Sequence, residues 1–349
     1  MVEEFEFKRL LLSAVKSLSK TPRIFDQFLR NGIWDFALTY INCDLNSTRW
    51  SQDQMQVLQI QVLDYTALMI SLYPHTFDDA SLFHVEIIDF LKRDLVSTKN
   101  EAVTSDKLRR HMDLIDSYLR VIYLLASCSA GHKRALVDLG IIPVLIQMIP
   151  QAPRLHRITV NIFMLISVFC WKSNINQQIF GECGGIAATI PYLSFNSSDH
   201  QELIQTHVST VACIWSSICG NLQNEIELFK SEGIYMVFDL LESPHSEVRS
   251  LSLGCILDLF ENPNCIFHLR QWRASSDVKK DIVCILVQLW IDMFTKESIS
   301  DKKFDAKDSN CVIQCTRIYA LLSKLGFNGK ETKLASAEHR IVLEEVIPF

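Results

Sequence analysis

The sequence predicts an all-α protein, a right-handed solenoid made by stacking short helical repeats. A phrase recurs three times, in which an apolar pair precedes a Gly-Ile step and an apolar run follows it. Its glycines are Gly140, Gly185 and Gly233, at intervals of 45 and 48 residues, and a weaker copy ends at Gly32-Ile33. Long segments also carry apolar residues every three or four positions, which is the pattern of a helix that buries one face.

A period in the forties on a helical background is typical of armadillo and HEAT repeats. A single repeat of this kind cannot bury its own apolar face, so neighbouring repeats stack into one continuous core. We therefore expect a single armadillo-like helical repeat domain over residues 1–349. The most regular repeats are expected at 131–263, irregular repeats at 1–130 and 264–325, and a tail at 326–349.

The apolar stripes predict long inner helices, with shorter outer helices between them. The clearest stripe runs from Leu108 to Ala126 in steps of three and four residues. Ser243-Pro244 offers a cap followed by a proline in the first turn, and Asp199 with Glu202 has the spacing of a capping box. The inner helices are expected near residues 49–72, 107–128, 153–171, 199–219, 244–261, 276–295 and 309–325.

Between the helices we expect turns and two surface insertions. The recurring glycine is expected in a left-handed or tightly turned conformation, because glycine adopts it without strain. The polar segments Lys92–Asp106 and Glu297–Asn310 are expected to form surface loops or linkers.

Composition narrows the class of partner and the compartment. The formal net charge is −6, which argues against nucleic acid, because phosphate binding depends on clustered Lys and Arg. No run reaches 18 apolar residues, so the most apolar stretches, 158–171 and 282–294, are expected as buried helices and not as membrane spans. Acidic residues at the N-terminus and 11 cysteines, mostly in apolar helical patterns, predict a reduced cytoplasmic protein.

We find no motif for catalysis, a cofactor or a small-molecule substrate, such as a phosphate-binding loop, HExxH or GxSxG. The segment Gly181–Gly185 fits the turn of a repeat better than a reactive-thiol loop. His200 and His207 lie seven residues apart, so His207 is expected in the core and not on a metal. Cys311 and Cys315 have no second ligand pair, so core packing is favoured for them too.

The polar faces of the inner helices are the candidate binding surface. Arg110, Asp113 and Arg120 share one face, and Arg157 and Asn161 occupy the same place on the next repeat; Arg249 follows further along. In a solenoid such faces line a groove that holds other proteins, although any surface helix also needs a solvated face. The residue types change from repeat to repeat, which favours a fixed partner over a ladder that binds repetitive peptides.

One helix superficially resembles the peptide-binding helix of the nuclear-import adaptors, which carry a ladder of Trp and Asn. It runs from Ala212 to Gly220 and contains Trp215. However, Cys219 stands where that ladder needs Asn, and Trp215 falls on the predicted core stripe. We therefore do not expect an import adaptor.

A second resemblance lies in residues 222–275. The helix Leu253-Gly254-Cys255-Ile256-Leu257-Asp258-Leu259-Phe260-Glu261-Asn262-Pro263, followed by His268-Leu269-Arg270-Gln271-Trp272-Arg273, is similar to the cilia- and flagella-associated protein 69 family. The resemblance implies a non-catalytic scaffold of the ciliary or flagellar axoneme, a cytoskeletal protein whose partners are central-pair proteins and which supports flagellum assembly and motility.

Two alternatives stay open at this point. Trp272 and Arg273 are candidate anchors for a partner protein, because a few aromatic and Arg side chains carry most of the energy of an interface; the alternative is that Trp272 packs the end of a repeat. The alternative function is a cytosolic armadillo-type adaptor that binds peptides in transport or signalling.

Overall fold

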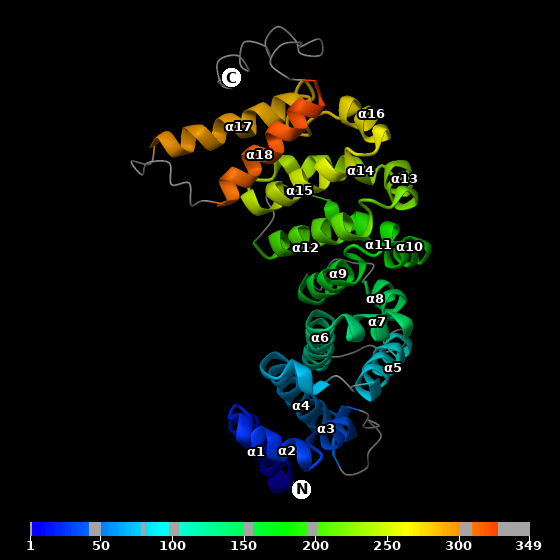
Figure 1. Ribbon diagram of the computed structural model, residues 1–349, viewed down its shortest axis with the longest axis vertical. Coiled ribbons are helices and arrows are strands. Elements are labelled where there is room, and N and C mark those ends of the chain that lie inside the picture. Colours follow the sequence, from blue (N-terminus) through cyan, green and yellow to red (C-terminus); the bar gives the residue numbers. More distant parts are fainter. Residues whose placement is uncertain are drawn as a thin grey trace. The chain divides into compact units, whose positions relative to one another are not determined.

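The computed structural model describes residues 2–41, 50–77, 81–97, 105–149, 156–194, 201–299 and 309–326 (Figure 1). Over these ranges the regular elements are α-helices and short 3-10 helices, as the all-α prediction requires. The chain divides into two compact units, Met1–Cys183 and Gly184–Phe349, here named the N-terminal unit and the C-terminal unit. One repeat domain over the whole of 1–349 stays a prediction.

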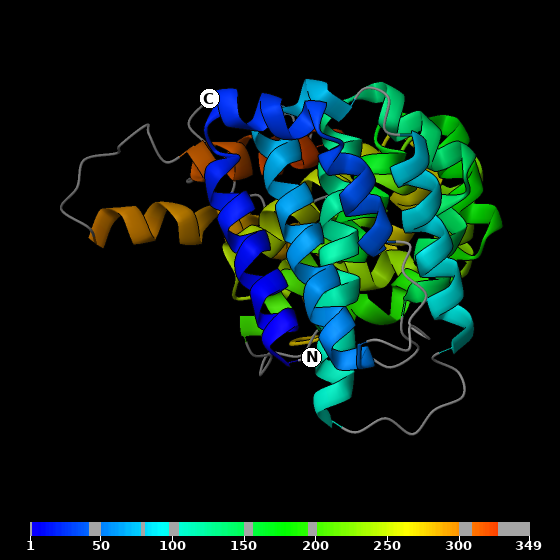
Figure 2. The ribbon, with the colours of Figure 1, turned by 90° about the horizontal axis from the view of Figure 1, so that it is seen from below.

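The N-terminal unit is organised around a row of long inner helices. In that row α4 packs against α6, and α6 packs against α9; α1 lies along the other side of α4 (Figure 2). Shorter helices cover the opposite side, where α7 and α8 complete a three-helix repeat with α9. The elements are α1 (Val2–Leu18), α2 (Pro22–Arg30), α3 (Ile33–Ile41), α4 (Gln52–Leu72), η1 (Pro74–Phe77), α5 (Ser81–Ser97), α6 (Ser105–Cys128), α7 (Ala130–Asp138), α8 (Ile141–Met148), α9 (His156–Cys170) and α10 (Asn174–Glu182).

The C-terminal unit repeats this organisation. Its row of inner helices is α12, α15 and α18, and α13 and α14 complete a three-helix repeat with α15 (Figure 1). The elements are α11 (Gly185–Thr189), η2 (Ile190–Leu193), α12 (Gln201–Ser217), α13 (Leu222–Lys230), α14 (Gly233–Asp239), η3 (Leu240–Glu242), α15 (Ser246–Leu259), α16 (Pro263–Gln271), α17 (Ile282–Ile299) and α18 (Ser309–Lys324).

A helix lies at each position where the sequence predicts an inner one, but one placement is wrong. The helix expected at 276–295 begins only at Ile282, because Asp281 caps it through Cys284 N–H. It packs against α18, whereas α15 contacts α18 directly, so α17 is not a member of the inner row.

Two other expectations need correction. The cap at Ser243 does not begin α15, because its hydroxyl accepts the N–H of His245 and the helix starts at Ser246. The insertions are shorter than expected, since residues 92–97 belong to α5 and residues 297–299 to α17. The parts of both insertions that separate the helices, 98–104 and 300–308, lie outside the described residues, as do Asp199, His200 and the tail from 327 onwards. Cys311 belongs to α18, but its side chain is outside what the structure describes.

The repeat glycines do not all serve the same purpose. Gly32 and Gly140 have φ of 74° and 84°, as the left-handed turn requires. In the next two copies the left-handed residue stands one position earlier, at Gly184 and Glu232. Gly233 is instead the first residue of α14, where a Cβ would lie 2.8 Å from Leu228 Cδ1 and 3.0 Å from Ile190 Cδ1. Glycine is needed at this position because the neighbouring side chains pack closely against it, and not because φ is positive.

Glu232→Gly is therefore expected to stabilise the C-terminal unit by about 0.5–1 kcal/mol. A side chain at φ 60° carries a left-handed penalty that glycine avoids, and the larger entropy of glycine in the unfolded chain offsets part of the gain. Urea unfolding measures the change. Glu227→Gly, on the exposed side of α13, is the matched control and should destabilise by about 1 kcal/mol; destabilisation by both variants would contradict the strain at Glu232.

Buried asparagines tie the short outer helices to the inner helices that precede them. Asn176 Nδ2 donates to Phe169 O at 2.7 Å, and Asn224 Nδ2 donates to Ser217 O at 2.9 Å. Each asparagine is the third residue of its outer helix, and each acceptor lies near the end of an inner helix, where carbonyls lack helical partners. The same side-chain position thus closes the corner in both units.

The interior of each unit is apolar and includes some, but not all, of the described cysteines. Phe163 and Phe180 in the N-terminal unit and Phe238 in the C-terminal unit are fully buried. None of the described cysteines forms a disulfide: Cys170, Cys213, Cys255 and Cys265 are buried, while Cys128 and Cys183 are exposed. No helix within the described ranges is long and apolar enough to cross a membrane.

A pair of buried histidines joins α5 to α7. The rings of His84 and His132 lie 5.0 Å apart, and each residue is almost inaccessible to water. Neither ring nitrogen of His84 has a hydrogen-bond partner in the described part of the chain. Burial, followed by the neighbouring His132, lowers the pKa of His84 to about 4, so this side chain is neutral in the folded state at pH 7.

We expect acid to destabilise the N-terminal unit through His84. The unfolded state binds a proton near pH 6.5 and the folded state only near pH 4, so stability falls as the pH drops through this window, by up to about 3 kcal/mol. Hydrogen exchange of the α5 and α7 amides between pH 7 and pH 4.5 measures the loss. His84→Phe keeps a ring in the core without a titrating group and should flatten the profile; equal loss in both proteins would rule out His84 as the cause.

Candidate protein-binding surface

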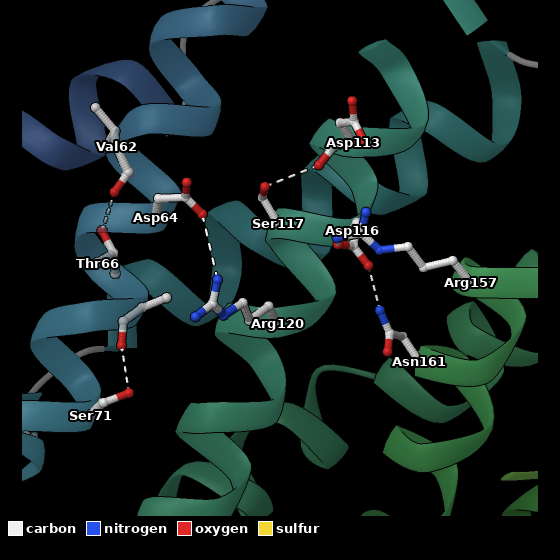
Figure 3. Close-up of polar contacts among 11 residues, drawn as sticks. Val62, Asp64, Thr66, Ser71, Asp113, Asp116, Ser117, Arg120, Arg157 and Asn161 are labelled. Atoms are coloured by element: carbon white, nitrogen blue, oxygen red, sulfur yellow. Dashed lines mark hydrogen bonds and ion pairs between the residues drawn. The ribbon is translucent and has the colours of Figure 1, made fainter. Parts of the chain in front are cut away.

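Four of the five predicted site residues of the N-terminal unit, Arg110, Arg120, Arg157 and Asn161, connect consecutive inner helices. The fifth, Asp113, is exposed on α6, and its carbonyl oxygen accepts from Ser117 Oγ of the same helix (Figure 3). Arg110 Nη2 lies 3.0 Å from Asp53 Oδ2, and Arg120 Nη1 lies 3.8 Å from Asp64 Oδ1, so both pairs join α6 to α4. The spacing of Arg110 and Arg120 places them toward α4 on the solvent side of α6. These arginines therefore help to hold neighbouring repeats together and also lie on the surface of the unit.

Asp116 is the central acceptor on this surface and was not predicted. Its two carboxylate oxygens accept separately from Arg157 and Asn161, which are one turn apart on α9 (Figure 3). The side chain of Asp116 is only 11% exposed, whereas that of Arg157 is 74% exposed. A carboxylate held between α6 and α9 by two donors fixes the relative position of these helices, and the guanidinium remains open to solvent.

The inner face of the N-terminal unit combines these charges with exposed apolar side chains. We use this name for the solvent side of α4, α6 and α9. Following the helical spacing, Asp113 and Arg120 lead to Tyr123, and Arg157 and Asn161 lead to Met164 and Trp171. Tyr123 is 39% exposed and Trp171 is 53% exposed, with Lys172 Nζ 5.6 Å from the centre of the Trp171 ring. Exposed aromatic and Arg side chains together are typical of protein interfaces.

In the C-terminal unit, Trp215 is half-buried at the edge of the packed face, and not in the core as the apolar stripe suggested. Its indole Nε1 donates to Asp258 Oδ2 at 2.6 Å and so joins α12 to α15. Arg317 of α18 lies over the same ring, 5.3 Å from its centre, and donates to Ser250 O. The ring covers Gly254, where only a hydrogen fits. One tryptophan thereby connects all three inner helices of this unit.

Arg249 serves the loop in front of its own helix. Its Nη1 donates to Ser243 O at 2.6 Å, and the side chain is half-buried. Burial lowers the pKa of the guanidinium, and Asp292 opposes that effect. Because Arg249 is half-buried and already donates to Ser243 O, less of its guanidinium is available to a partner protein than in Arg120 and Arg157.

The structure favours the packing alternative for Trp272. The side chain is 3% exposed, its Nε1 donates to Asp239 Oδ1 at 2.8 Å, and the ring meets Phe238 edge-on. Burial raises the pKa of Asp239, and the bond from Trp272 opposes this rise. A tryptophan buried in this way is not an exposed anchor. Arg273 is exposed, but its Nη1 donates to the carbonyls of Arg270 and Trp272 and so caps the end of α16.

The other residues of the 253–273 sequence motif also hold repeats together. Asn262 caps α16 through the N–H of Asn264, and its Nδ2 donates to Glu225 Oε2 at 2.8 Å on α13. Glu261 pairs with Lys324 of α18, and His268 Nδ1 lies 3.0 Å from Tyr235 Oη. The motif is thus a set of contacts between neighbouring helices, which explains why these residue types occur at this spacing.

His207, one of the side chains considered as a metal ligand, packs within the fold. His207 is buried, and its Nε2 lies 3.0 Å from Ser194 O. Among the described residues, no group of three or more His, Cys, Asp or Glu side chains is arranged to hold a metal ion. The turn expected at Gly181–Gly185 is present, with Gly184 in the left-handed conformation between α10 and α11.

Comparison with solved structures shows the fold. A structure described as Uso1-2 has a TM-score of 0.56 at 14% identity, covering 84% of this chain and 43% of that one. A computationally designed armadillo repeat protein for modular peptide recognition has a TM-score of 0.52 at 16% identity, covering 82% of this chain and 98% of that one. Both likenesses concern the fold alone, which is an armadillo-type α-solenoid.

Sequence relatives show the family. Cilia- and flagella-associated protein 69 of Homo sapiens is 25% identical over 133 residues, 37% of this chain and 14% of the human protein. The protein of the same name from Mus musculus is 22% identical over 316 residues, 82% of this chain and 32% of the mouse protein. The chain spans less than a third of these curated relatives. The family described as cilia- and flagella-associated protein 69, ARM repeat, matches residues 1–307, and the chain belongs to this family.

Proposed function

We propose that the chain is a scaffold of the ciliary or flagellar axoneme that binds central-pair proteins along the inner face of its N-terminal unit. The fold and the family support a repeat-based protein-binding scaffold. The location follows from the name of the relatives, which are described as cilia- and flagella-associated. The central-pair assignment rests on the resemblance of residues 222–275.

The observation that carries the choice of surface is the arrangement of Arg120, Arg157, Tyr123 and Trp171. Each of the two arginines pairs with a carboxylate on the preceding inner helix, yet 64% and 74% of their side chains remain exposed. Holding an Arg in place before binding reduces the entropy that an interface has to overcome. Tyr123 lies one turn after Arg120 on α6, and Trp171 follows the last residue of α9; both exposed rings add apolar area to the surface that carries these charges. Arg110, Asp113 and Asn161 belong to the same surface.

The other predicted residues fit this proposal less well. Trp272 is buried, and Arg249 and Arg273 each donate through Nη1 to backbone carbonyls within the chain. We therefore place the main interface on the N-terminal unit. This surface contains both charge signs, with Asp53 and Asp64 opposite Arg110 and Arg120, so it suits a protein partner of mixed charge better than a nucleic acid.

Proximity labelling in ciliated and non-ciliated cells tests the proposal. The double variant Arg120→Ala/Trp171→Ala should label axonemal proteins at least tenfold less than the wild type does, because an interface depends on a few Arg and aromatic side chains. Arg134→Ala/Phe7→Ala removes one exposed Arg and one exposed aromatic residue elsewhere in the same unit, and should label as the wild type does.

Two results would overturn parts of this proposal. Equal loss in the control variant would place the interface elsewhere on the unit. Enrichment of soluble cargo or signalling proteins in both cell types, with no axonemal proteins, would favour the alternative function of a cytosolic peptide-binding adaptor. Folding of each variant is checked by circular dichroism before it is compared.

A further inference from the structure

Two cysteines from consecutive inner helices of the C-terminal unit meet at the corner where α12 ends. The Sγ atoms of Cys219 and Cys255 lie 3.8 Å apart, and Cys219 Sγ is also 3.8 Å from Cys255 O. Cys255 is fully buried in the middle of α15, whereas Cys219 follows α12 and is partly accessible. The thiols are 36 positions apart in sequence, so the stacking of repeats brings them together.

We propose that Cys219 and Cys255 form a modification site, at which hydrogen peroxide converts the two thiols into a disulfide between α12 and α15. Peroxide is a small oxidant, and Cys219 is the more accessible of the two residues. The two sulfurs are already in van der Waals contact. Their separation has to shorten from 3.8 Å to about 2.05 Å, the length of an S–S bond.

The chemistry has two steps. The Cys219 thiol first loses its proton, and the thiolate sulfur attacks one oxygen of peroxide; the O–O bond breaks and a sulfenic acid remains on Cys219. The hydroxide that leaves takes up the proton that the thiol lost and becomes the first water. The Cys255 sulfur then attacks the Cys219 sulfur, the S–OH bond breaks, and a second water leaves with the thiol proton. Two thiols are oxidised by two electrons in total, and one peroxide is reduced to two waters.

The surroundings of Cys219 make this reaction slow at neutral pH. Burial raises the pKa of the Cys219 thiol well above its usual value, and the neighbouring Cys255, Asp258 and Glu225 raise it further. Only a small fraction is the reactive thiolate at pH 7. We therefore expect the rate of disulfide formation to rise roughly tenfold for each pH unit between 7 and 9.

The bond would fasten the two helices that Trp215 and Asp258 already connect. A cross-link that closes a loop of this length reduces the freedom of the unfolded chain. We expect the melting temperature of the C-terminal unit to rise by roughly 5–10 °C, reversibly on addition of a thiol reductant. The site thus couples oxidation to the rigidity of one repeat junction.

The test treats the full chain with hydrogen peroxide, blocks remaining thiols and maps cross-linked peptides by mass spectrometry. Cleavage after Lys230 and Arg249 separates the two cysteines, and fragmentation identifies the bonded sulfurs. The wild type should yield the Cys219–Cys255 link, and Cys219→Ala or Cys255→Ala should abolish it together with the melting shift. Cys128→Ala and Cys183→Ala remove exposed thiols and should leave both results unchanged.

Three outcomes would overturn the proposal. The first is oxidation of Cys219 to a sulfinic acid with no cross-link. The second is a link from Cys219 to Cys265, which is buried near Cys255. The third is a dimer joined through Cys128 or Cys183. The mapping on the wild type does not depend on the variants, so it remains decisive if Cys255→Ala, which alters the core, fails to fold.

Discussion

Gly254→Ala is expected to destabilise the C-terminal unit by roughly 1–3 kcal/mol, the usual cost of overpacking. A Cβ at this position would lie 2.4 Å from Trp215 Cη2 and 3.0 Å from Arg317 Cζ. The ring is not free to move aside, because its Nε1 is bound to Asp258 and Arg317 lies over it. The clash therefore outweighs the gain of about 1 kcal/mol that alanine brings to a helix.

Hydrogen exchange of the α15 amides measures this change. Gly131→Ala is the matched control, because its Cβ would meet only Ser129 Oγ, at 3.3 Å, so it should be neutral or slightly stabilising. A smaller side chain at Trp215, as in Trp215→Leu, should reduce the further cost of Gly254→Ala. Wild-type stability in Gly254→Ala would show that the three inner helices are not held around this ring.

Asn224→Ala is expected to lower the stability of the C-terminal unit by about 2 kcal/mol, and Asn176→Ala that of the N-terminal unit by a similar amount. Each variant leaves a buried carbonyl, Ser217 O or Phe169 O, without the side chain that donates to it. A buried acceptor that loses its partner costs about 1–3 kcal/mol. Neither position is easily rescued by water, because both asparagines are almost completely buried.

Urea unfolding and hydrogen exchange at the ends of α9 and α12 measure these losses. Asn174→Ala and Asn264→Ala are controls, because they remove exposed asparagines from the first turns of α10 and α16. They should change stability by less than about 0.5 kcal/mol. If the buried and exposed variants behave alike, the asparagines do not hold the corners together.

Part of the candidate surface could be predicted from the sequence. Helical spacing placed Arg110, Asp113 and Arg120 on one face and Arg157 with Asn161 on the next, and they do occupy the solvent side of the inner row. The pairing with Asp116 could not be predicted, because its partners stand 41 and 45 positions away. Whether Asp116 meets Arg157 and Asn161 depends on the axial offset between α6 and α9, which the apolar periodicity of each helix does not specify.

The burial of Trp215 and Trp272 could not be predicted from the sequence either, and the two predictions failed in opposite ways. The sequence favoured a core position for Trp215 and a possible surface role for Trp272, whereas Trp215 lies over Gly254 and Trp272 is buried against Phe238. Both indoles are positioned by a carboxylate from another helix, Asp258 or Asp239. A helical stripe cannot distinguish the edge of a buried face from its centre, since that depends on the neighbour that packs there.

The sequence by itself determined the all-α class, the repeat period and the positions of all the predicted inner helices but one, because apolar spacing and helix-ending residues act within a few positions along the chain. It also carried the family, through residues that now prove to be contacts between repeats. Only the tertiary structure decided which glycine turns and which one packs, where α17 lies, and which arginines are paired. Those features arise from side chains that meet across repeats some forty residues apart, where local spacing no longer constrains the geometry.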